Sequence, residues 1–483
     1  MQLFKDKKKL SEINSIFESN QISDKLVDTF GIFKNKRLSN EFLGVKDKGV
    51  KLEDTFLSLL ILPFLGISSV YAIFKSNIQG ITESGKDVFY GFKNNSFINW
   101  RKIIYIYVKT FLKKVKKEGQ QVKNAVKCLI IDDSTLEKTG EKIEHVSFVH
   151  DHTTNRWLLG FKILTLGFWD GKSFLGIDFS LQKENPQNDN KWFKKILKRI
   201  KKYGFHKKRD KSSSGKKREL ELNNSKIDNA LNMIRRAVKN GILPEYVLAD
   251  SWFISEEFIK TIRRLKKGVI HVLGMVRQDK RKYLVNGKYY SSKALIAKYS
   301  CMVKISRKLR MQYYPIYVEY KGVKIKLFLV RQGFGTSGKW KIILSTNTGI
   351  SFIKAIKTYS IRWTIEVFFK EQKQYFNLGK SQSNDFDAQI ADASISFIQN
   401  IMISLMLRFS EYETKGELFK ESQQYLISQT IAVRIWEFIL EILTEIFAVL
   451  EVDIDNLIKK IIQDKNTEKK IMKMLFALKT IKY

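Results

Sequence analysis

The spacing of hydrophobic residues divides the chain into helical and strand-rich stretches. Over residues 1 to 120, apolar residues recur three or four positions apart, as in DKLVDTFGIF and NWRKIIYIYVKTFLKKV, and this spacing predicts amphipathic helices. From residue 127 the period changes. KCLIID (127–132) is a short β-branched run that ends in acids, and EYVLAD (245–250) is a second apolar run with an acid at its end. We therefore expect two strands that end at carboxylates.

Further strands are expected on both sides of the second acid. Two apolar, aromatic runs within 157–181 meet at Asp170-Gly171, which is a strong hairpin signal. From 268 to 333 one strand pattern follows another, and KIILSTN (341–347) is typical of one more strand. This strand-rich block separates the second acid from the last part of the chain.

Helical spacing returns in four further segments. We expect helices at about 219–240, 352–377 and 385–410, and a helical remainder to the C-terminus. The most basic segment, 191–218, begins with helical spacing and continues with serines and a glycine that are typical of a flexible loop. We expect this segment to contact phosphates without reading bases, because flexible lysines supply charge but little bidentate geometry.

Without the strand-rich block, the order is three strands, a helix, a strand, and then a strand and a helix. This is the order of the ribonuclease-H-like fold, in which an antiparallel meander is followed by parallel strands packed on helices. The predicted class is therefore α/β: a ribonuclease-H-like catalytic core with a β-strand insertion, flanked by helical N- and C-terminal regions. The predicted parts are a helical N-terminal DNA-binding region (1–120), the first part of the core (121–250), the β-strand insertion (251–340), the second part of the core (341–410) and a helical C-terminal region (411–483).

The charge of the chain points to a polyanionic partner. Its 483 residues include 87 Lys and Arg but only 49 Asp and Glu, which gives a net charge of +38. A lysine-rich composition can reflect AT-rich coding DNA, but that bias should raise the acids nearly as much. Neutralising a phosphate releases a condensed counterion, so the excess favours nucleic acid as the partner. The two cysteines, Cys128 and Cys301, lie far apart and indicate neither a zinc site nor a disulfide framework.

One uncharged stretch is long enough to span a bilayer. Residues 55–74 hold 20 residues without a charge. Pro63 and Gly66 lie near its middle, however, and a buried helix–turn–helix explains the stretch better than a membrane span. The N-terminus has no apolar segment after its charges, as a secretory signal would. We expect a cytoplasmic protein without a membrane partner.

Three acids lie where the predicted fold would bring them together. Asp132 ends the first strand, Asp250 ends the strand that would lie beside it, and Glu366 lies on the helix after the last strand. Clustered carboxylates repel one another unless cations hold them, and Mg²⁺ prefers oxygen ligands. Two such ions can clamp the attacking and leaving oxygens of a displacement at phosphorus. Any one of these acids alone would be an ordinary polar group at a strand end.

The helix that bears Glu366 presents four functional side chains on one face. Tyr359, Arg362, Glu366 and Lys373 stand at offsets 0, 3, 7 and 14, which places them within an arc of about 60° at 3.6 residues per turn. An acid between cations can be an ordinary surface ion pair, since Glu366 follows Arg362 by four residues. As a DNA site, the acid would bind metal and its neighbours would bind phosphates beside the scissile bond.

The same helix resembles a known family. YSIRWTIEVFFKEQK matches without a gap the Y-(2)-R-(3)-E-(6)-K signature of DDE transposases from a large group of bacterial insertion sequences. IIDDSTLEKTG looks like the first-aspartate segment of that group, and VLADSWF looks like the second. The block at about 252–340 resembles the β-strand insertion that this group has between its second aspartate and its glutamate. The resemblance covers about 120–410.

The resemblance implies a function and a catalytic triad. Asp132, Asp250 and Glu366 correspond to the catalytic, metal-binding residues. Proteins of this group cut transposon ends with Mg²⁺, for which Mn²⁺ can substitute, and join them to target DNA. They act on double-stranded DNA with terminal inverted repeats, as homodimers in a synaptic complex. The implied location is the bacterial cytoplasm, with the nucleoid.

The resemblance also assigns the other signature residues and leaves one position open. Tyr359, Arg362 and Lys373 correspond to the DNA-binding residues of the signature. Asp132 and Asp133 are adjacent, and strand alternation would point only one of them at the metal ions. Asp132 is favoured because it directly follows the apolar run, and Asp133 remains the alternative ligand.

A second function belongs to a different class. A transposase-derived protein could retain DNA binding after losing catalysis, and an excision assay would separate it from an active enzyme. Three aromatic residues of the strand-rich half could stack on a flipped base, although packing between strands is the commoner role of such residues; they are Trp252, Tyr313 and Tyr314.

Overall fold

A computed structural model describes most of the chain and divides it into two compact units. The described residues are 29, 31–33, 36–42, 50–75, 85–184, 191–335 and 338–427. The larger unit comprises 29–60 and 82–416 and contains every residue of the expected site. The smaller unit comprises 1–28, 61–81 and 417–483. The expected helical C-terminal region lies outside the described residues from 428 onward.

The described part of the smaller unit is helical. It contains a 3₁₀ turn, η1 (Leu62–Leu65), and a helix, α5 (Val70–Lys75). Pro63 stands at the start of η1, and Gly66 ends it in the left-handed conformation with φ of 71°. The side-chain amide of Gln423 donates to the Pro63 carbonyl at 2.8 Å. The uncharged stretch 55–74 is therefore interrupted by a turn at the predicted residues and forms no single helix.

The larger unit contains helices that cover a sheet. They are α3 (Lys36–Phe42), α4 (Leu52–Ile61, whose last residue belongs to the smaller unit), α6 (Lys86–Lys93), α7 (Trp100–Lys117), α8 (Lys191–Tyr203), α9 (Ser214–Glu221), α10 (Lys226–Lys239), α11 (Glu256–Arg264), α12 (Ser292–Tyr299), α13 (Phe352–Ser360), α14 (Thr364–Tyr375) and α15 (Phe386–Arg408). Two 3₁₀ segments, η2 (Leu265–Gly268) and η3 (Ile361–Trp363), continue α11 and join α13 to α14.

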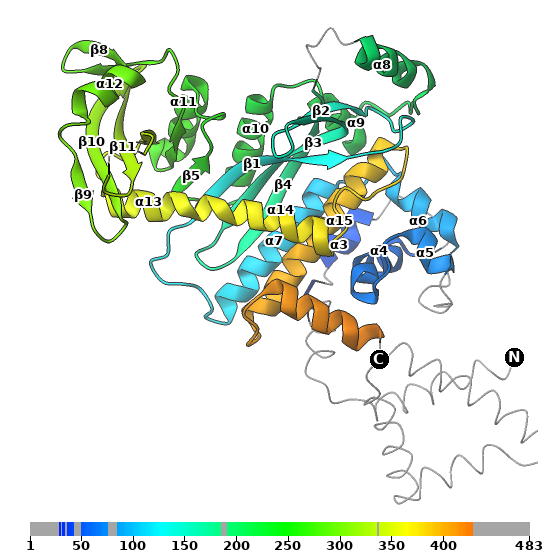
Figure 1. Ribbon diagram of the computed structural model, residues 1–483. Coiled ribbons are helices and arrows are strands. Elements are labelled where there is room, and N and C mark those ends of the chain that lie inside the picture. Colours follow the sequence, from blue (N-terminus) through cyan, green and yellow to red (C-terminus); the bar gives the residue numbers. More distant parts are fainter. Residues whose placement is uncertain are drawn as a thin grey trace, which may run out of the picture. The chain divides into compact units, whose positions relative to one another are not determined.

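The described strands form one mixed sheet (Figure 1). They are β1 (Cys128–Glu137), β2 (Ser147–Asp151), β3 (Arg156–Trp169), β4 (Phe174–Gln182), β5 (Tyr246–Ala249), β6 (His271–Val276), β7 (Lys282–Val285), β8 (Lys288–Ser291), β9 (Lys304–Ser306), β10 (Met311–Tyr320), β11 (Val323–Gln332) and β12 (Lys341–Ser345). The strand order is β2-β3-β1-β5-β6-β12-β11-β10-β7-β8, with β4 paired to β3 and β9 paired to β10.

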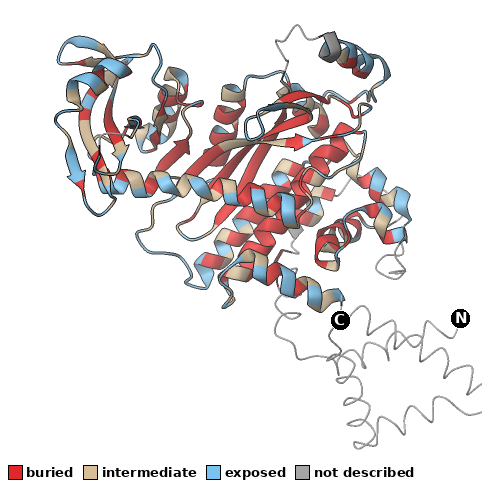
Figure 2. Cartoon of the chain, viewed as in Figure 1, coloured by how far each residue is buried: buried red, intermediate tan, exposed pale blue. Residues whose placement is uncertain are grey.

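The centre of the sheet has the predicted change from antiparallel to parallel pairing. β1, β3 and β4 form an antiparallel meander, and the β3–β4 hairpin turns at Asp170-Gly171 as predicted. The Asp170 carboxylate caps this turn by accepting the backbone N–H groups of Lys172 and Ser173. β5 then pairs in parallel with β1. The strands are buried here (Figure 2), which explains their continuous apolar runs.

The next parallel strand comes from the strand-rich block. β6 pairs in parallel with β5, whereas β12 pairs with β6 in the antiparallel sense. The sequence predicted that residues 341–347 form the next core strand after β5 and that no strand of the block joins the core. This prediction is wrong, because β6 lies between β5 and β12. Hydrophobic periodicity identifies both segments as strands, but it does not specify the partner of either one.

The helix expected at 352–377 is interrupted, whereas the one expected at 385–410 is confirmed as α15. Ile361–Trp363 forms the 3₁₀ segment η3 between α13 and α14. α15 is 23 residues long and apolar enough to cross a membrane, but 89% of its most apolar stretch is buried inside the protein. α15 is therefore a helix of the protein core (Figure 2).

The basic segment 191–218 consists of two different parts. Its first part is the predicted helix, α8. The expected flexible loop is wrong, because Ser213 caps a helix, α9, and Arg209 is buried in ion pairs with Glu144, Asp385 and Asp387. Because those acids are distant in the sequence, the lysine-rich composition of the segment predicted that Arg209 would be exposed to solvent. The helix expected at 219–240 is also divided, into the end of α9 and the whole of α10.

Candidate active site

β1 presents its two adjacent aspartates to different partners. The Asp132 carboxylate accepts a hydrogen bond from Arg362 Nη1 at 2.8 Å. The Asp133 carboxylate instead accepts one from Lys226 Nζ, also at 2.8 Å, at the start of α10. Neighbouring residues on a strand point to opposite faces of the sheet. Asp132 therefore lies on the face covered by η3 and α14, and Asp133 lies on the face of α10.

Parallel pairing places Asp250 beside Asp132. Ile131 of β1 stands opposite Ala249 of β5, so the next residue on each chain segment is an aspartate. The expectation that Asp132 ends the first strand is wrong, because β1 continues in antiparallel pairing with β3 as far as Glu137. Only the first part of β1, up to Ile131, pairs with β5, so Asp132 lies where the parallel pairing ends. The Asp250 carboxylate accepts the backbone N–H of Trp252 at 2.9 Å, and in the described part of the chain it has no ion-pair partner.

Arg362 joins two carboxylates from different elements. Its Nη1 contacts Asp132, and its Nη2 donates to Glu366 Oε1 on α14 at 2.6 Å. The Arg362 side chain is 13% exposed, and its Nε has no hydrogen-bond partner within the described residues. The two arms of one planar group therefore connect the first strand to the last helix of the expected triad.

The other two signature residues lie beside this arrangement. Lys373 Nζ donates to Ser134 Oγ at 2.9 Å, two residues along β1 from Asp132 and on the same face. Burial raises the pKa of Tyr359, and the neighbouring Arg362 acts in the opposite direction. The signature face predicted from helical spacing thus points toward β1, although η3 interrupts the helix that carries it.

Electrostatics distinguish Asp132 from an ordinary surface acid. Burial raises the pKa of the Asp132 carboxyl to about 7; the Arg362 charge opposes this rise, and the carboxylates of Asp133 and Asp250 add to it. Asp132, Asp250 and Glu366 are three acidic side chains, and Arg362 supplies one positive charge among them. The cluster therefore has an excess of negative charge that a further cation would offset.

The three carboxylates are suitable ligands for a hard divalent cation, but they do not form one group that could hold it. Carboxylate oxygens at the end of a sheet are the ligands that Mg²⁺ and Mn²⁺ prefer. Within the described residues, however, no three His, Cys, Asp or Glu side chains are gathered as a group that could hold a metal ion. The Arg362 guanidinium lies between Asp132 and Glu366 and bridges the two carboxylates.

Sequence reasoning missed three side chains of this region. Lys226 forms an ion pair with Asp133, and Lys162 Nζ lies 4.0 Å from the Asp133 carboxylate. Ser134 accepts a hydrogen bond from Lys373. Strand alternation from Asp132 could have identified Ser134. The two lysines gave no comparable signal, because their positions depend on how α10 and β3 pack against β1.

The aromatic residues considered for base stacking have different environments. Tyr313 stacks on Phe352 with ring centroids 3.8 Å apart, and Tyr314 stacks on Tyr299. Both rings therefore pack within the protein. Trp252 is 40% exposed, and Lys226 Nζ lies 4.8 Å from the centre of its ring. Of the three, it has the most accessible surface beside the carboxylates.

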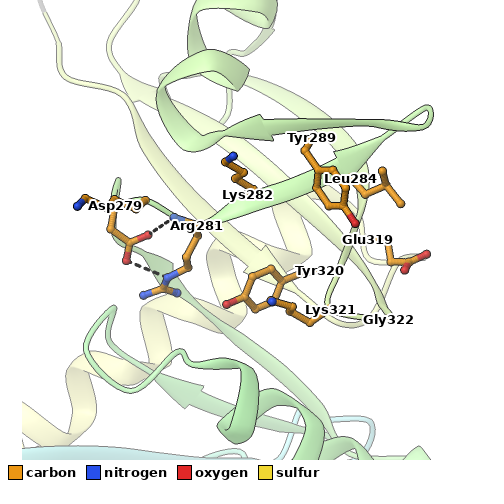
Figure 3. A pocket seen from close by; sticks show the side chains of 10 residues that line it. Asp279, Arg281, Lys282, Leu284, Tyr289, Glu319, Tyr320, Lys321 and Gly322 are labelled. Atoms are coloured by element: carbon orange, nitrogen blue, oxygen red, sulfur yellow. Dashed lines mark hydrogen bonds and ion pairs between the residues drawn. The ribbon is translucent and has the colours of Figure 1, made fainter.

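A separate pocket lies within the strand-rich block. It has a volume of about 810 Å³ and lies near the β7–β8 hairpin and the end of β10 (Figure 3). In Figure 3, Asp279 pairs with Arg281, and the Tyr289 side chain extends from β8. None of the three expected catalytic carboxylates lines this pocket. It is therefore distinct from the candidate active site.

Two models of protein families match the part of the chain that contains these residues. Residues 222–398 match the family model described as a transposase DDE domain, and residues 89–292 match the model described as a DDE superfamily endonuclease. The first range includes Asp250 and Glu366, and the second includes Asp132 and Asp250. Among curated proteins, no relative matches the chain.

Proposed function

On the basis of its DDE-superfamily transposase or endonuclease domain, we propose that this chain is a DNA transposase. Domains of this superfamily are ribonuclease-H-like, and the parallel and antiparallel pairing around β1 is consistent with that fold. We assign the chain to the group with the Y-(2)-R-(3)-E-(6)-K signature. The strand-rich block, 251–340, would be its β-strand insertion, with β6 of this block lying beside β5 in the core sheet. The enzyme would cut the ends of an insertion sequence and join them to target DNA by metal-dependent phosphodiester transfer.

One observation supports this function most strongly. Asp132, in the middle of β1, lies beside Asp250, which directly follows β5, and Arg362 connects Asp132 to Glu366. Asp250 and Glu366 are distant from Asp132 in the sequence, and strand pairing links the first to Asp132 while Arg362 links the second. Clustered carboxylates repel one another unless cations offset their charge.

The proposed roles follow from the chemistry of each side chain. The Mg²⁺ ions, for which Mn²⁺ could substitute, would be held by Asp132, Asp250 and Glu366. Two ions would stabilise the attacking and the leaving oxygen of an in-line displacement at phosphorus. When bound, such ions polarise a phosphoryl oxygen and lower the pKa of an attacking hydroxyl. Arg362 and Lys373 cannot ligate a cation, so their donors would orient the phosphates on either side of the scissile bond.

The geometry favours Asp132 over Asp133 as the ligand. Asp133 faces Lys226 and Lys162, which together neutralise its charge on the other face of the sheet. Asp132 shares its face with Arg362, Ser134 and Lys373. Tyr359 would contact DNA from the last turn of α13, before η3.

Several features extend the proposal beyond the catalytic core. Double-stranded DNA with terminal inverted repeats would be the substrate, target DNA the acceptor, and a homodimer the synaptic form. We propose that the helical region 1–120 binds the inverted repeats and that 341–410 completes the core begun at 121–250. The protein would act in the bacterial cytoplasm, in association with the nucleoid.

Cleavage of the DNA ends that flank the gene tests this function. We expect the full-length protein to nick candidate inverted repeats in Mg²⁺ or Mn²⁺ and to be inactive in a chelator. Asp250→Asn should bind the same DNA and not cleave it, because the substitution removes a ligand and leaves the basic surface intact. Cleavage by Asp250→Asn at the wild-type rate contradicts the triad. DNA binding by the wild-type protein without any cleavage would favour the inactive, transposase-derived alternative.

A further inference from the structure

Arg362 occupies a position that the proposed metal ions would also require. Its two terminal nitrogens lie 2.8 Å from an oxygen of Asp132 and 2.6 Å from an oxygen of Glu366. A carboxylate oxygen that accepts a charge-assisted hydrogen bond is less available to a metal ion. Arg362 therefore competes with a divalent cation for these two oxygens, and its positive charge opposes a second cation beside it.

We propose that Arg362 is the resident cation of the carboxylate cluster in the DNA-free protein and that it leaves when a DNA phosphate offers it a replacement anion. The inference rests on the proposed function, because it assumes that the same carboxylates take up divalent cations. It adds that DNA binding and metal binding are coupled through one side chain. A metal ion would then be held tightly only when DNA is in place.

The local structure provides a way for the guanidinium to move. Arg362 lies at the centre of η3, a three-residue 3₁₀ segment between two α-helices. Short 3₁₀ segments within longer helices often mark hinges, because their hydrogen bonds are less favourable than those of an α-helix. Trp363, which follows Arg362, is 62% exposed, so this turn reaches the protein surface.

Arg362 also has an unused hydrogen-bond donor. Its Nε is buried and has no partner among the described residues. Its contacts with the carboxylates use one nitrogen for each, whereas a phosphate can accept two parallel N–H groups from one guanidinium. Exchange of the two carboxylates for a phosphate would therefore preserve the charge pairing of Arg362.

Thermodynamic reciprocity gives the expected effects. If DNA removes Arg362 from the carboxylates and so increases their affinity for metal, then metal must increase the affinity for DNA by the same factor. Coupling between two sites typically changes affinity by a factor of about 5 to 150. We expect a value of roughly 10-fold here, since one guanidinium leaves two carboxylates and gains one phosphate.

Binding of Mn²⁺ by the full-length protein tests the proposal without a catalytic readout. Calorimetry, or the resonance signal of free Mn²⁺, would measure affinity with and without a DNA end. The wild-type protein should bind Mn²⁺ about 10-fold more tightly with DNA, whereas Arg362→Ala without DNA should already bind about 10-fold more tightly than the wild type. Arg362→Gln, which keeps most of the side-chain volume, should behave in the same way if Arg362→Ala does not fold.

Lys373→Ala is the matched control. It removes one positive charge from the same helix face, but Lys373 contacts Ser134 and neither carboxylate. If Lys373→Ala also increases Mn²⁺ affinity by about 10-fold, general electrostatics explain the effect and the proposal for Arg362 is overturned. Equal Mn²⁺ affinity of wild type and both Arg362 variants without DNA overturns it as well.

Failure of the proposed function would have a different signature. In that case the wild-type protein would bind no Mn²⁺ at the carboxylates, with or without DNA, and Asp250→Asn would leave every measured affinity unchanged. A different result would reject only the coupling. In that case the wild type would bind Mn²⁺, Asp250→Asn would abolish this binding, and the Arg362 variants would bind Mn²⁺ as tightly as the wild type.

Discussion

Two clusters of carboxylates and arginines in the larger unit differ in how their charges balance. In the first, the fully buried Asp178 of β4 accepts hydrogen bonds from Arg101 at 2.8 Å and from Arg236 at 2.9 Å. Glu221 completes this cluster by pairing with Arg101. Burial alone would raise the pKa of Asp178, but the arginines outweigh it and the pKa is lowered. This carboxylate is ionised and fully compensated.

The second cluster has the opposite balance. Asp132 shares one arginine with Glu366 and lies near the carboxylate of Asp250, and burial raises its pKa to about 7. Burial of an acid therefore does not by itself indicate function. The Asp178 cluster connects α7, α9 and α10 to the sheet, whereas the cluster around Asp132 has negative charge left for a ligand.

The largest expected effect concerns Glu366. Glu366→Ala should reduce DNA cleavage by roughly 10³-fold, since metal-ion catalysis supplies several kcal/mol and each 1.4 kcal/mol is a factor of about ten. The variant should still form the paired-end complex, because Arg362 and Lys373 remain. A gel shift beside a cleavage assay measures both properties.

The arginine and the lysine of the same face should affect a different step. Arg362→Ala and Lys373→Ala should lose cleavage mainly because the DNA end is misplaced, and Arg362→Lys should restore only part of the activity, since a point charge cannot replace a planar fork. If Glu366→Ala abolishes end binding while Arg362→Ala and Lys373→Ala cleave at the wild-type rate, the helix face is only a structural ion-pair ladder.

Parts of this arrangement could be predicted from the sequence because they depend on local patterns. The apolar runs that end at Asp132 and Asp250 are strand signals, and the spacing of Arg362 and Glu366 places them on one helix face. η3 was not predicted, because Ile361-Arg362-Trp363 contains neither glycine nor proline to interrupt a helix.

Other features depend on partners that are distant in the sequence. Arg209 belongs to a lysine-rich stretch typical of solvated loops, and only folding brings Glu144, Asp385 and Asp387 to it. The parallel pairing of β6 with β5 is likewise a property of the assembled sheet. The contact of Arg362 with Asp132 could be inferred only in outline, from the expectation that the first strand and the last helix converge.

The next expected effect separates the two clusters by stability. Asp178→Ala should lower the free energy of unfolding by about 2–3 kcal/mol, because it removes a fully buried carboxylate that two half-buried arginines share and leaves both with Glu221 as their remaining partner. Asp132→Ala should change it by less than about 1 kcal/mol, since Arg362 keeps Glu366 as a partner and a desolvated acid is removed. Urea denaturation of both variants measures the difference. Similar losses for the two would mean that both clusters are structural.

The same contrast between compensated and exposed charge applies to the basic segment. Lys195, Lys198, Lys201 and Lys202 on α8 are exposed, whereas Arg209 is buried. Replacing these four lysines with glutamine should weaken binding to all DNA sequences alike. It should also reduce the slope of log K against log salt by about 0.9 for each phosphate that the variant no longer neutralises. A loss of affinity confined to the specific end sequence would identify α8 as a reader of bases.

The smallest expected effect distinguishes the two adjacent aspartates. Asp133→Asn should retain cleavage within about 3-fold, because Asp133 pairs with Lys226 on the other face of the sheet and exposed or half-buried pairs contribute little. Asp132→Asn should resemble Glu366→Ala in its loss of cleavage. The reverse result would make Asp133 the ligand, and the assignment of the two faces would have to be exchanged.

The central claim is that Asp250 and its partners bind the metal ions that act on DNA. Asp250→Cys tests it most directly, since a thiolate accepts Mn²⁺ better than the harder Mg²⁺. We predict that this variant does not cleave the DNA ends in Mg²⁺, that Mn²⁺ restores cleavage in part, and that Asp250→Asn is inactive with either ion. Cleavage by Asp250→Asn, or equal activity of Asp250→Cys in both metals, would contradict the claim.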